Sequence, residues 1–186
     1  AMERKHRTTA QDGTPNTPDT TPKIYDREMV RGIVINTEGK ILVMQKGEKS
    51  KTAHMWEFVG GSVIGSIPAK PAKLVKELIR EAKEETTIVL KAEQISPIEQ
   101  TFDYDRVHNG ITSFGFVYVY IVRLDETQSA QRIKVNKREN LVDYRWVTIS
   151  ELGEMHQERA GDMMRISPNS EKIVAHLITN PQLLAA

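Results

Sequence analysis

Between residues 74 and 85 the chain carries apolar and acidic side chains with the period of an α-helix. The apolar members recur at three- and four-residue intervals, which marks one buried stripe: Leu74, Val75, Leu78, Ile79 and Ala82. At about 100° per residue, four glutamates fall within roughly a third of the helix circumference, along one border of this stripe: Glu77, Glu81, Glu84 and Glu85. The pattern predicts a helix that packs on a core by one face and carries a row of carboxylates at the edge of that contact.

This row of carboxylates favours a bound cation. Glu77 and Glu81 lie one helical turn apart, and like-charge pairs at this spacing destabilise a helix unless something positive lies between them. Hard carboxylate oxygens suit Mg²⁺ or Mn²⁺, and Mg²⁺ is usually held by carboxylates, waters and substrate phosphates together. The pattern therefore predicts a metal site that acts on phosphates. The alternative is a solvated acidic face offset by neighbouring lysines: Lys73, Lys76 and Lys83.

Two segments resemble motifs of a known family. Residues 80–88, Arg-Glu-Ala-Lys-Glu-Glu-Thr-Thr-Ile, are similar to the second half of the Nudix box, G-x5-E-x7-R-E-U-x-E-E-x-G-U with U aliphatic. Residues 56–61, Trp-Glu-Phe-Val-Gly-Gly, resemble the strand and diglycine that open this box in many members. The resemblance implies the Nudix α/β/α sandwich, a mixed sheet flanked by helices, over roughly residues 26 to 180.

The first half of the box departs from the family pattern. Gly61 lies 19 residues before Arg80, whereas the family has 14, so the loop is five residues longer. Counting back from the arginine puts Ala72 at the position of the first Glu of the box, and counting forward from the glycines puts Ile67 there. Thr87 stands where the family has Gly. We expect these changes to affect the positioning of the carboxylates more than their ability to bind a metal.

The resemblance assigns roles to residues that match the motif. Three glutamates match the metal-binding carboxylates of the family: Glu81, Glu84 and Glu85. The carbonyl of Gly61 matches a further ligand, and Arg80 matches the arginine that orients the helix and its carboxylates. The implied cofactor is Mg²⁺ or Mn²⁺. Glu77, one turn before Glu81, either supports the arginine in place of the missing Glu or faces the solvent as an ordinary surface residue.

A reaction of this kind needs a carboxylate that accepts the proton of the attacking water. The family often has a further Glu on a loop before the strand that ends in Trp, and Glu139 before Trp146 fits that place. Asp143 and Glu126 stay open as alternatives. Either Glu81 or Glu139 is expected to be the general base, because members of the family differ in this respect.

Composition narrows the choice of partners and location. Lys and Arg total 26 against 25 Asp and Glu, a formal net charge of +1, so no overall basic field predicts binding to long nucleic acid. The expected partner is a small nucleotide. The lack of cysteine excludes disulfides and thiolate metal sites and fits the cytoplasm. No apolar run approaches the roughly 20 residues that cross a bilayer, so we expect no contact with a membrane.

Residues 1–23 are mostly polar and are predicted to be a flexible tail, followed by a single Nudix-like domain over residues 24–186. Strands are expected at 31–35, 40–45, 56–59, 87–90, 115–122 and 143–147, with hairpin turns at 36–39 and 103–110. Ser150 is expected to cap a short helix. Ser167 and Pro168 are expected to begin a last helix, whose apolar stripe contains Ile173, Val174, Leu177 and Ile178.

The function expected is metal-dependent hydrolysis of a phosphoanhydride in a nucleoside diphosphate derivative. Residues 56–61 are similar to the branch that converts nucleoside triphosphates to monophosphates and pyrophosphate, which makes these the leading substrates. A sugar-nucleotide or dinucleotide pyrophosphatase is one alternative. A catalytically weak or inactive domain that binds a nucleotide as a sensor is another, and a non-enzymatic interaction protein is the third. Many relatives pair through their sheets or amino-terminal strands, which leaves a homodimer open.

Overall fold

The computed structural model describes residues 24–156 and 164–185, so the predicted tail at 1–23 lies outside the described residues. The strands are β1 (Ile24–Ile35), β2 (Ile41–Lys46), β3 (Trp56–Glu57), β4 (Val59–Ser62), β5 (Ile95–His108), β6 (Ile111–Arg123) and β7 (Leu141–Val147). The helices are α1 (Pro71–Thr86), α2 (Glu126–Ala130), α3 (Ile149–His156) and α4 (Pro168–Thr179). Short 3₁₀ turns follow as η1 (Ala92–Gln94), η2 (Lys137–Glu139) and η3 (Pro181–Leu184).

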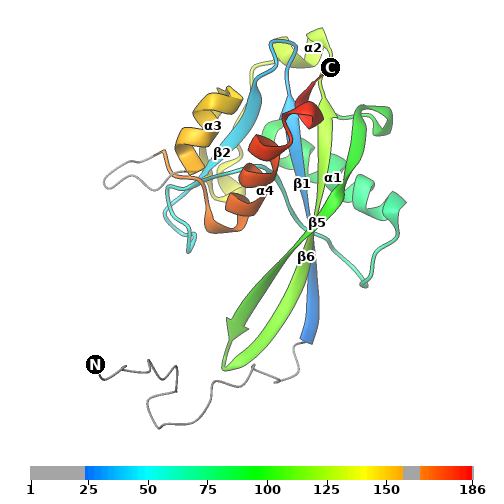
Figure 1. Ribbon diagram of the computed structural model, residues 1–186, viewed down its shortest axis with the longest axis vertical. Helices are drawn as coiled ribbons and strands as arrows, with labels where there is room; N and C mark the ends of the chain where they lie inside the picture. The colour runs from blue at the N-terminus through cyan, green and yellow to red at the C-terminus, as the bar shows by residue number, and fades with distance from the viewer. Residues whose placement is uncertain (1–23, 157–163, 186) are drawn as a thin grey trace, which may run out of the picture.

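The strands form one seven-stranded mixed sheet. Five strands follow the order β3-β2-β1-β6-β5, while β4 pairs with β1 and β7 pairs with β2. The pairing of β1 with β6 is parallel, and the other pairs are antiparallel. Helix α1 lies against one face of the sheet, and α3 and α4 lie against the other (Figure 1). The predicted mixed sheet flanked by helices is therefore confirmed.

Strand β1 divides the core into two layers, because successive side chains of a strand point to opposite faces of its sheet. Val30 and Val34 pack in the layer that contains Leu78 of α1. Ile33 packs in the opposite layer with residues of α3 and α4. Between them, Gly32 leaves room for the helix, since a Cβ at this position would lie 3.1 Å from Leu78 Cδ1. The backbone of β1 therefore lies close beneath α1, which fixes the helix relative to the sheet.

One predicted strand and the extent of one predicted turn are wrong. Residues 87–90 do not form a strand, because Thr87 takes a left-handed conformation at φ 68° and ends α1. Residues 103–108 belong to β5 instead of a loop. The hairpin turn is confined to Asn109 and Gly110, whose φ values of 51° and 75° suit a two-residue turn between twisted strands. The predicted hairpin of β1 and β2 pairs next to its turn at Ile35 and Ile41, and β2 then continues beside β7.

The helix ends also correct the sequence analysis. Thr148, and not Ser150, caps α3: its Oγ1 accepts a hydrogen bond from the Glu151 amide at 3.1 Å, and the Glu151 side chain accepts one from the Thr148 amide at 3.1 Å. Helix α4 begins at Pro168 as predicted. Its stripe buries Ile173, Val174 and Leu177, whereas Ile178 is 42% exposed.

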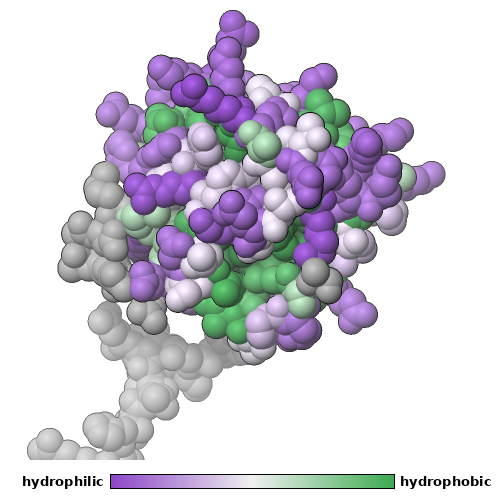
Figure 2. Space-filling model, turned by 90° about the horizontal axis from the view of Figure 1, so that it is seen from above, coloured by the Kyte–Doolittle hydropathy of each residue, from purple (hydrophilic) through white to green (hydrophobic). Residues whose placement is uncertain are grey.

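Within the described ranges no helix has both the length and the apolar character needed to cross a bilayer. Hydrophilic side chains surround a smaller hydrophobic area on the face shown in Figure 2. The ends of β1, β5 and β6 extend beyond the helices as a ribbon, while α1 lies against the opposite end of the sheet (Figure 1). The carboxylates of α1 are consequently held by the packed body of the protein.

Candidate metal and catalytic site

Helix α1 determines where the predicted carboxylates lie. Leu74, Leu78 and Ala82 are buried against the sheet, and this orientation brings the bordering glutamates over β4. Three of the four glutamates are themselves almost completely buried, with exposed fractions of 4% for Glu77, 8% for Glu81 and 4% for Glu85. The Glu84 side chain is 41% exposed. The interpretation of Glu77 as a solvent-facing residue is therefore wrong, and so is that of the whole row as a solvated surface.

The two glycines of β4 allow the backbone to approach these carboxylates. The Gly60 amide donates a hydrogen bond to Glu85 Oε1 at 3.3 Å. Its φ of +142° is rarely adopted by residues with a side chain, and a Cβ there would lie 1.9 Å from the Val30 carbonyl oxygen. A Cβ on Gly61 would lie 2.6 Å from Glu81 Oε1. A larger residue at Gly60 would therefore clash with the backbone of β1, and one at Gly61 would have to displace the Glu81 side chain of α1.

A cluster of three carboxylates forms where α1 meets η2. One carboxylate oxygen from each of Glu81, Glu84 and Glu139 lies within 4.8 Å of the others. Glu139 therefore reaches the helix carboxylates from a segment more than fifty residues away in sequence. In the described part of the chain, neither sequence alternative belongs to this cluster: Asp143 lies on β7, where its Oδ1 accepts from the Tyr144 amide, and Glu126 lies in the first turn of α2.

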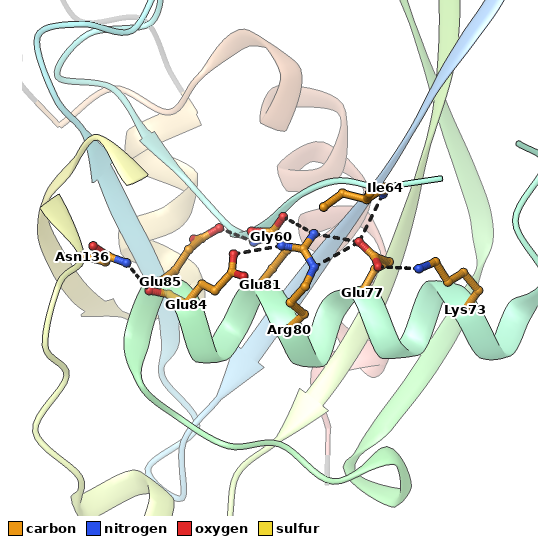
Figure 3. A network of polar contacts seen from close by, with 9 residues as sticks. All are labelled: Gly60, Ile64, Lys73, Glu77, Arg80, Glu81, Glu84, Glu85 and Asn136. Atoms are coloured by element: carbon orange, nitrogen blue, oxygen red, sulfur yellow. Dashed lines mark hydrogen bonds and ion pairs between the residues drawn. The ribbon is translucent and has the colours of Figure 1, made fainter. Parts of the chain in front are cut away.

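Arg80 joins the carboxylates of α1 into one network (Figure 3). Its Nη2 lies 2.7 Å from Glu77 Oε2 and 3.0 Å from Glu81 Oε1. Its Nη1 lies 2.9 Å from Glu84 Oε2. Burial alone lowers the pKa of Arg80, but the hydrogen bond to Glu77 and the charge of Glu81 raise it above its ordinary value. The guanidinium is therefore a permanent positive charge that fixes three acidic side chains.

Glu77 anchors this arginine from the side opposite the cluster. Besides its ion pair with Arg80, Glu77 pairs with Lys73 Nζ at 2.9 Å and accepts a hydrogen bond from the Ile64 amide at 3.2 Å. Burial by itself raises the pKa of Glu77, but the hydrogen bonds from Arg80, Lys73 and Ile64 outweigh it and lower this pKa to about 2. Ile64 lies in the lengthened loop after Gly61. Glu77 thus links Arg80 and Lys73 to the lengthened loop.

The carboxylates near β4 have the properties expected of metal ligands. Burial raises the pKa of Glu81, and Arg80 opposes this effect while the charge of Glu84 adds to it. Burial raises the pKa of Glu85 well above its ordinary value. Glu85 Oε2 is buried, and no hydrogen-bond partner for it exists among the described residues. A buried, unpartnered carboxylate oxygen beside an acidic cluster fits a hard divalent cation, which would replace the lost solvation.

The structure also contains a buried charged group that the sequence analysis missed. Arg31 of β1 donates through Nη1 to the Phe58 carbonyl at 3.0 Å and lies 3.5 Å from Glu57 Oε1. Lys46 Nζ lies 3.1 Å from the same oxygen. The charge of Arg31 lowers the pKa of Glu85 against its burial, while Glu57 acts in the opposite direction. An arginine within the apolar run of β1 was the sequence signal for this group.

Comparison with known proteins gives a family match. The family model described as NUDIX domain matches residues 26–167. No curated protein sequence matches the chain. The solved structure of the MutT protein from Methanosarcina mazei Go1 has a TM-score of 0.59 and 16% identity, covering 86% of this chain and 97% of that one.

Two further solved structures of similar fold contain bound ligands. The NUDIX domain of Shewanella oneidensis NrtR complexed with ADP ribose has a TM-score of 0.58 and 12% identity, over 89% of this chain and 94% of that one. A bifunctional NMN adenylyltransferase/ADP ribose pyrophosphatase from Francisella tularensis, complexed with AMP and a manganese ion, has a TM-score of 0.58 and 20% identity, over 86% of this chain and 43% of that one. At these identities the likeness establishes the fold.

Proposed function

This chain belongs to the NUDIX domain family, and from its site we propose that it hydrolyses a phosphoanhydride bond in nucleotides, with nucleoside triphosphates as the preferred substrates and monophosphate and pyrophosphate as products. Family membership confirms the predicted resemblance and the predicted enzyme class, a Nudix-type pyrophosphohydrolase. The observation that carries the proposal is the meeting of Glu81, Glu84 and Glu139 within 4.8 Å. A group of this kind has a chemical use when it binds a metal that binds phosphate.

Four groups of the chain would hold the metal: the carboxylates of Glu81, Glu84 and Glu85 and the carbonyl of Gly61. A bound Mg²⁺ or Mn²⁺ supplies charge neutralisation at the phosphate oxygens and a coordinated water of lowered pKa. Arg80 fixes the side chains of Glu81 and Glu84, so that little reorganisation is needed when substrate arrives.

Glu139 is exposed at the end of η2 and touches the cluster from the solvent side. We assign to it the acceptance of the proton from the attacking water, with Glu81 as the alternative base. Glu81 has one oxygen paired with Arg80 at 3.0 Å and is itself a proposed metal ligand, so fewer of its lone pairs can accept the proton of a water. This difference in surroundings favours Glu139.

One observation favours the second candidate function, a nucleotide-binding domain with little turnover. Arg80 forms direct ion pairs with both Glu81 and Glu84, which reduces the negative charge that these carboxylates offer to a metal. Family relatives of similar fold are described with ADP ribose and with AMP and manganese. Sugar nucleotides and dinucleotides therefore belong among the candidate ligands beside the triphosphates.

The test is release of phosphate and pyrophosphate from a panel of nucleoside triphosphates, ADP-ribose and dinucleoside polyphosphates, with Mg²⁺, with Mn²⁺ and with chelator. Glu84→Gln and Glu85→Gln are compared with Glu93→Gln, which changes an exposed glutamate of η1 that has no ion pair in the described ranges. Metal-dependent turnover that the first two variants lose and the third keeps supports the hydrolase. Tight nucleotide binding without turnover in the unaltered protein supports the sensor instead.

Several expectations stay predictions beside this proposal. The identity of the ion, a homodimer, a location in the cytoplasm and a single domain over residues 24–186 each need their own measurement. Size-exclusion chromatography with light scattering settles the oligomeric state, and titration calorimetry with Mg²⁺ and Mn²⁺ settles the ion.

A further inference from the structure

A hollow of about 440 Å³ opens beside the carboxylate cluster. One wall consists of Glu84 and Thr87 at the end of α1, and the other of residues 134–138, which lead into η2. Three exposed side chains of this second wall are cationic: Lys134, Lys137 and Arg138. Within the described residues none of them has an ion pair, whereas Lys46, Lys73 and Arg80 each contact a glutamate. The hollow therefore has uncompensated positive charge along one side.

The cationic segment is fixed to the helix that carries the carboxylates. Asn136 Nδ2 donates to the Glu84 carbonyl at 2.9 Å, and Figure 3 shows this amide beside the last turn of α1. Asn136 Oδ1 accepts from the Arg138 amide at 3.0 Å. The following Asn140 carbonyl accepts from the Gly47 amide at 2.8 Å. These bonds hold the backbone in one conformation before any ligand arrives, which reduces the ordering needed on binding.

The same segment runs directly into the cluster. Glu139 follows Arg138, and its carboxylate meets those of Glu81 and Glu84. A phosphate chain whose reacting group is held at the cluster can continue along the segment, because its next phosphate is one anhydride oxygen away. Positive side chains at that place attract a further phosphate, whereas the neutral sugar of ADP-ribose gains nothing from them.

We propose that this hollow is a subsite for the distal phosphate of a nucleoside triphosphate, bound by Lys137 and Arg138 with help from Lys134. The proposal rests on the proposed function and adds to it a basis for substrate choice. Nucleotides with a third phosphate are bound more tightly than nucleotides in which a diphosphate ends in a sugar. Removal of the cationic side chains removes this preference and leaves the carboxylate cluster intact.

The experiment measures dissociation constants by calorimetry for an α,β-methylene analogue of ATP and for ADP-ribose, both with Mg²⁺ at low ionic strength. The K137A/R138A double variant is expected to bind the triphosphate about tenfold or more weakly, since it loses charge-assisted hydrogen bonds. Its affinity for ADP-ribose is expected to change by less than about twofold. Lys76→Ala is the matched control, because Lys76 is an exposed lysine of α1 about 12 Å along the helix from Glu84.

Equal weakening for both ligands would show that the cations act only as a general electrostatic field, and it would overturn the subsite. An unchanged affinity for the triphosphate would overturn it as well. A second titration separates this failure from failure of the proposed function: inorganic tripolyphosphate is added without nucleotide, and amide NMR shifts of residues 134–138 are followed. Shifts there, absent in the double variant, support the subsite even when no nucleotide is hydrolysed. The opposite result is that triphosphates are hydrolysed, that no such shifts occur, and that the KM is unchanged in the double variant. This result supports the hydrolase and refutes the subsite.

Discussion

Replacement of Glu77 by Gln tests whether this carboxylate takes the place of the missing first Glu of the box. The variant keeps the size of the side chain and an oxygen that accepts from the Ile64 amide, and it removes the negative charge between Arg80 and Lys73. Because Glu77 is only 4% exposed, water cannot stabilise these two cations in place of the lost carboxylate. The substitution therefore weakens the ion pair between residue 77 and Arg80, and it replaces none of the three carboxylates of the cluster.

The expected loss of stability follows from the pKa of Glu77. Its hydrogen bonds lower this pKa from 4.5 to about 2, which corresponds to about 3 kcal/mol in favour of the charged form. Arg80 is 30% exposed and Lys73 is 46% exposed, so screening by water reduces this figure. We expect the free energy of unfolding to fall by about 1 to 3 kcal/mol at pH 7.

Urea unfolding between pH 3 and pH 7 measures this loss. The folded-state pKa of Glu77 lies below its unfolded value, so the stabilisation is fully present above about pH 4.5 and decreases as the pH falls towards 2. At pH 3 less than half of the difference between the unaltered protein and Glu77→Gln is expected to remain. A loss of kcat/KM by about 10- to 100-fold is expected in parallel, because Arg80 loses its anchor.

Glu93→Gln is the control, since it removes an exposed carboxylate without an ion pair in the described part of the chain. The reasoning is refuted when Glu77→Gln is as stable as Glu93→Gln at pH 7. It is equally refuted when the stability difference stays constant from pH 7 to pH 3, because the effect would then come from packing and not from charge.

Three further outcomes test other parts of the structure. Glu139→Gln is expected to lower kcat at least about a hundredfold with little change in fold, whereas Glu126→Gln leaves turnover rates unchanged. Thr87→Gly is expected to raise the free energy of unfolding, measured in urea, by about 0.5 to 1 kcal/mol, because it relieves the left-handed strain at φ 68°. A fall in stability would show that the hydrogen bonds of the Thr87 side chain outweigh this strain. Gly60→Ala is expected to lower the Tm by more than about 5 °C, since its Cβ would lie 1.9 Å from the Val30 carbonyl, and an unchanged Tm would contradict the tight contact of β4 with β1.

The helix and its carboxylates were predictable because local periodicity determines them. Leu74, Leu78 and Ala82 are buried as their spacing indicates. The wrong strand at 87–90 came from β-branched residues after the helix, and propensity alone did not show that Thr87 would end α1 in a left-handed conformation. Local preference predicts an element well and its boundary poorly when the backbone at the boundary is unusual.

The role of Glu77 was not predictable from helix periodicity, because its partners come from other segments. The Ile64 amide reaches it from the lengthened loop, and no spacing rule relates that loop to the helix. The burial of Arg31 and Glu57 likewise depends on the contact between β1 and the segment after β3. Residues 134–138 gave no recognisable motif, although their charges were visible, since the bond from Asn136 to α1 exists only in the folded chain.

The parallel pairing of β1 with β6 has a consequence for how the protein folds. Ile35 pairs with Arg123, and Ile24 pairs with Ser113, so the paired residues of these two central strands lie almost ninety positions apart in the sequence. A large entropy of loop closure must be overcome before these strands gain any contact energy, and topologies of this kind fold slowly. Helix α1 can form early from local contacts, but β4 joins the sheet through β1. Because Glu139 must reach Glu81 and Glu84 across more than fifty residues of chain, we expect the acidic cluster to form after α1.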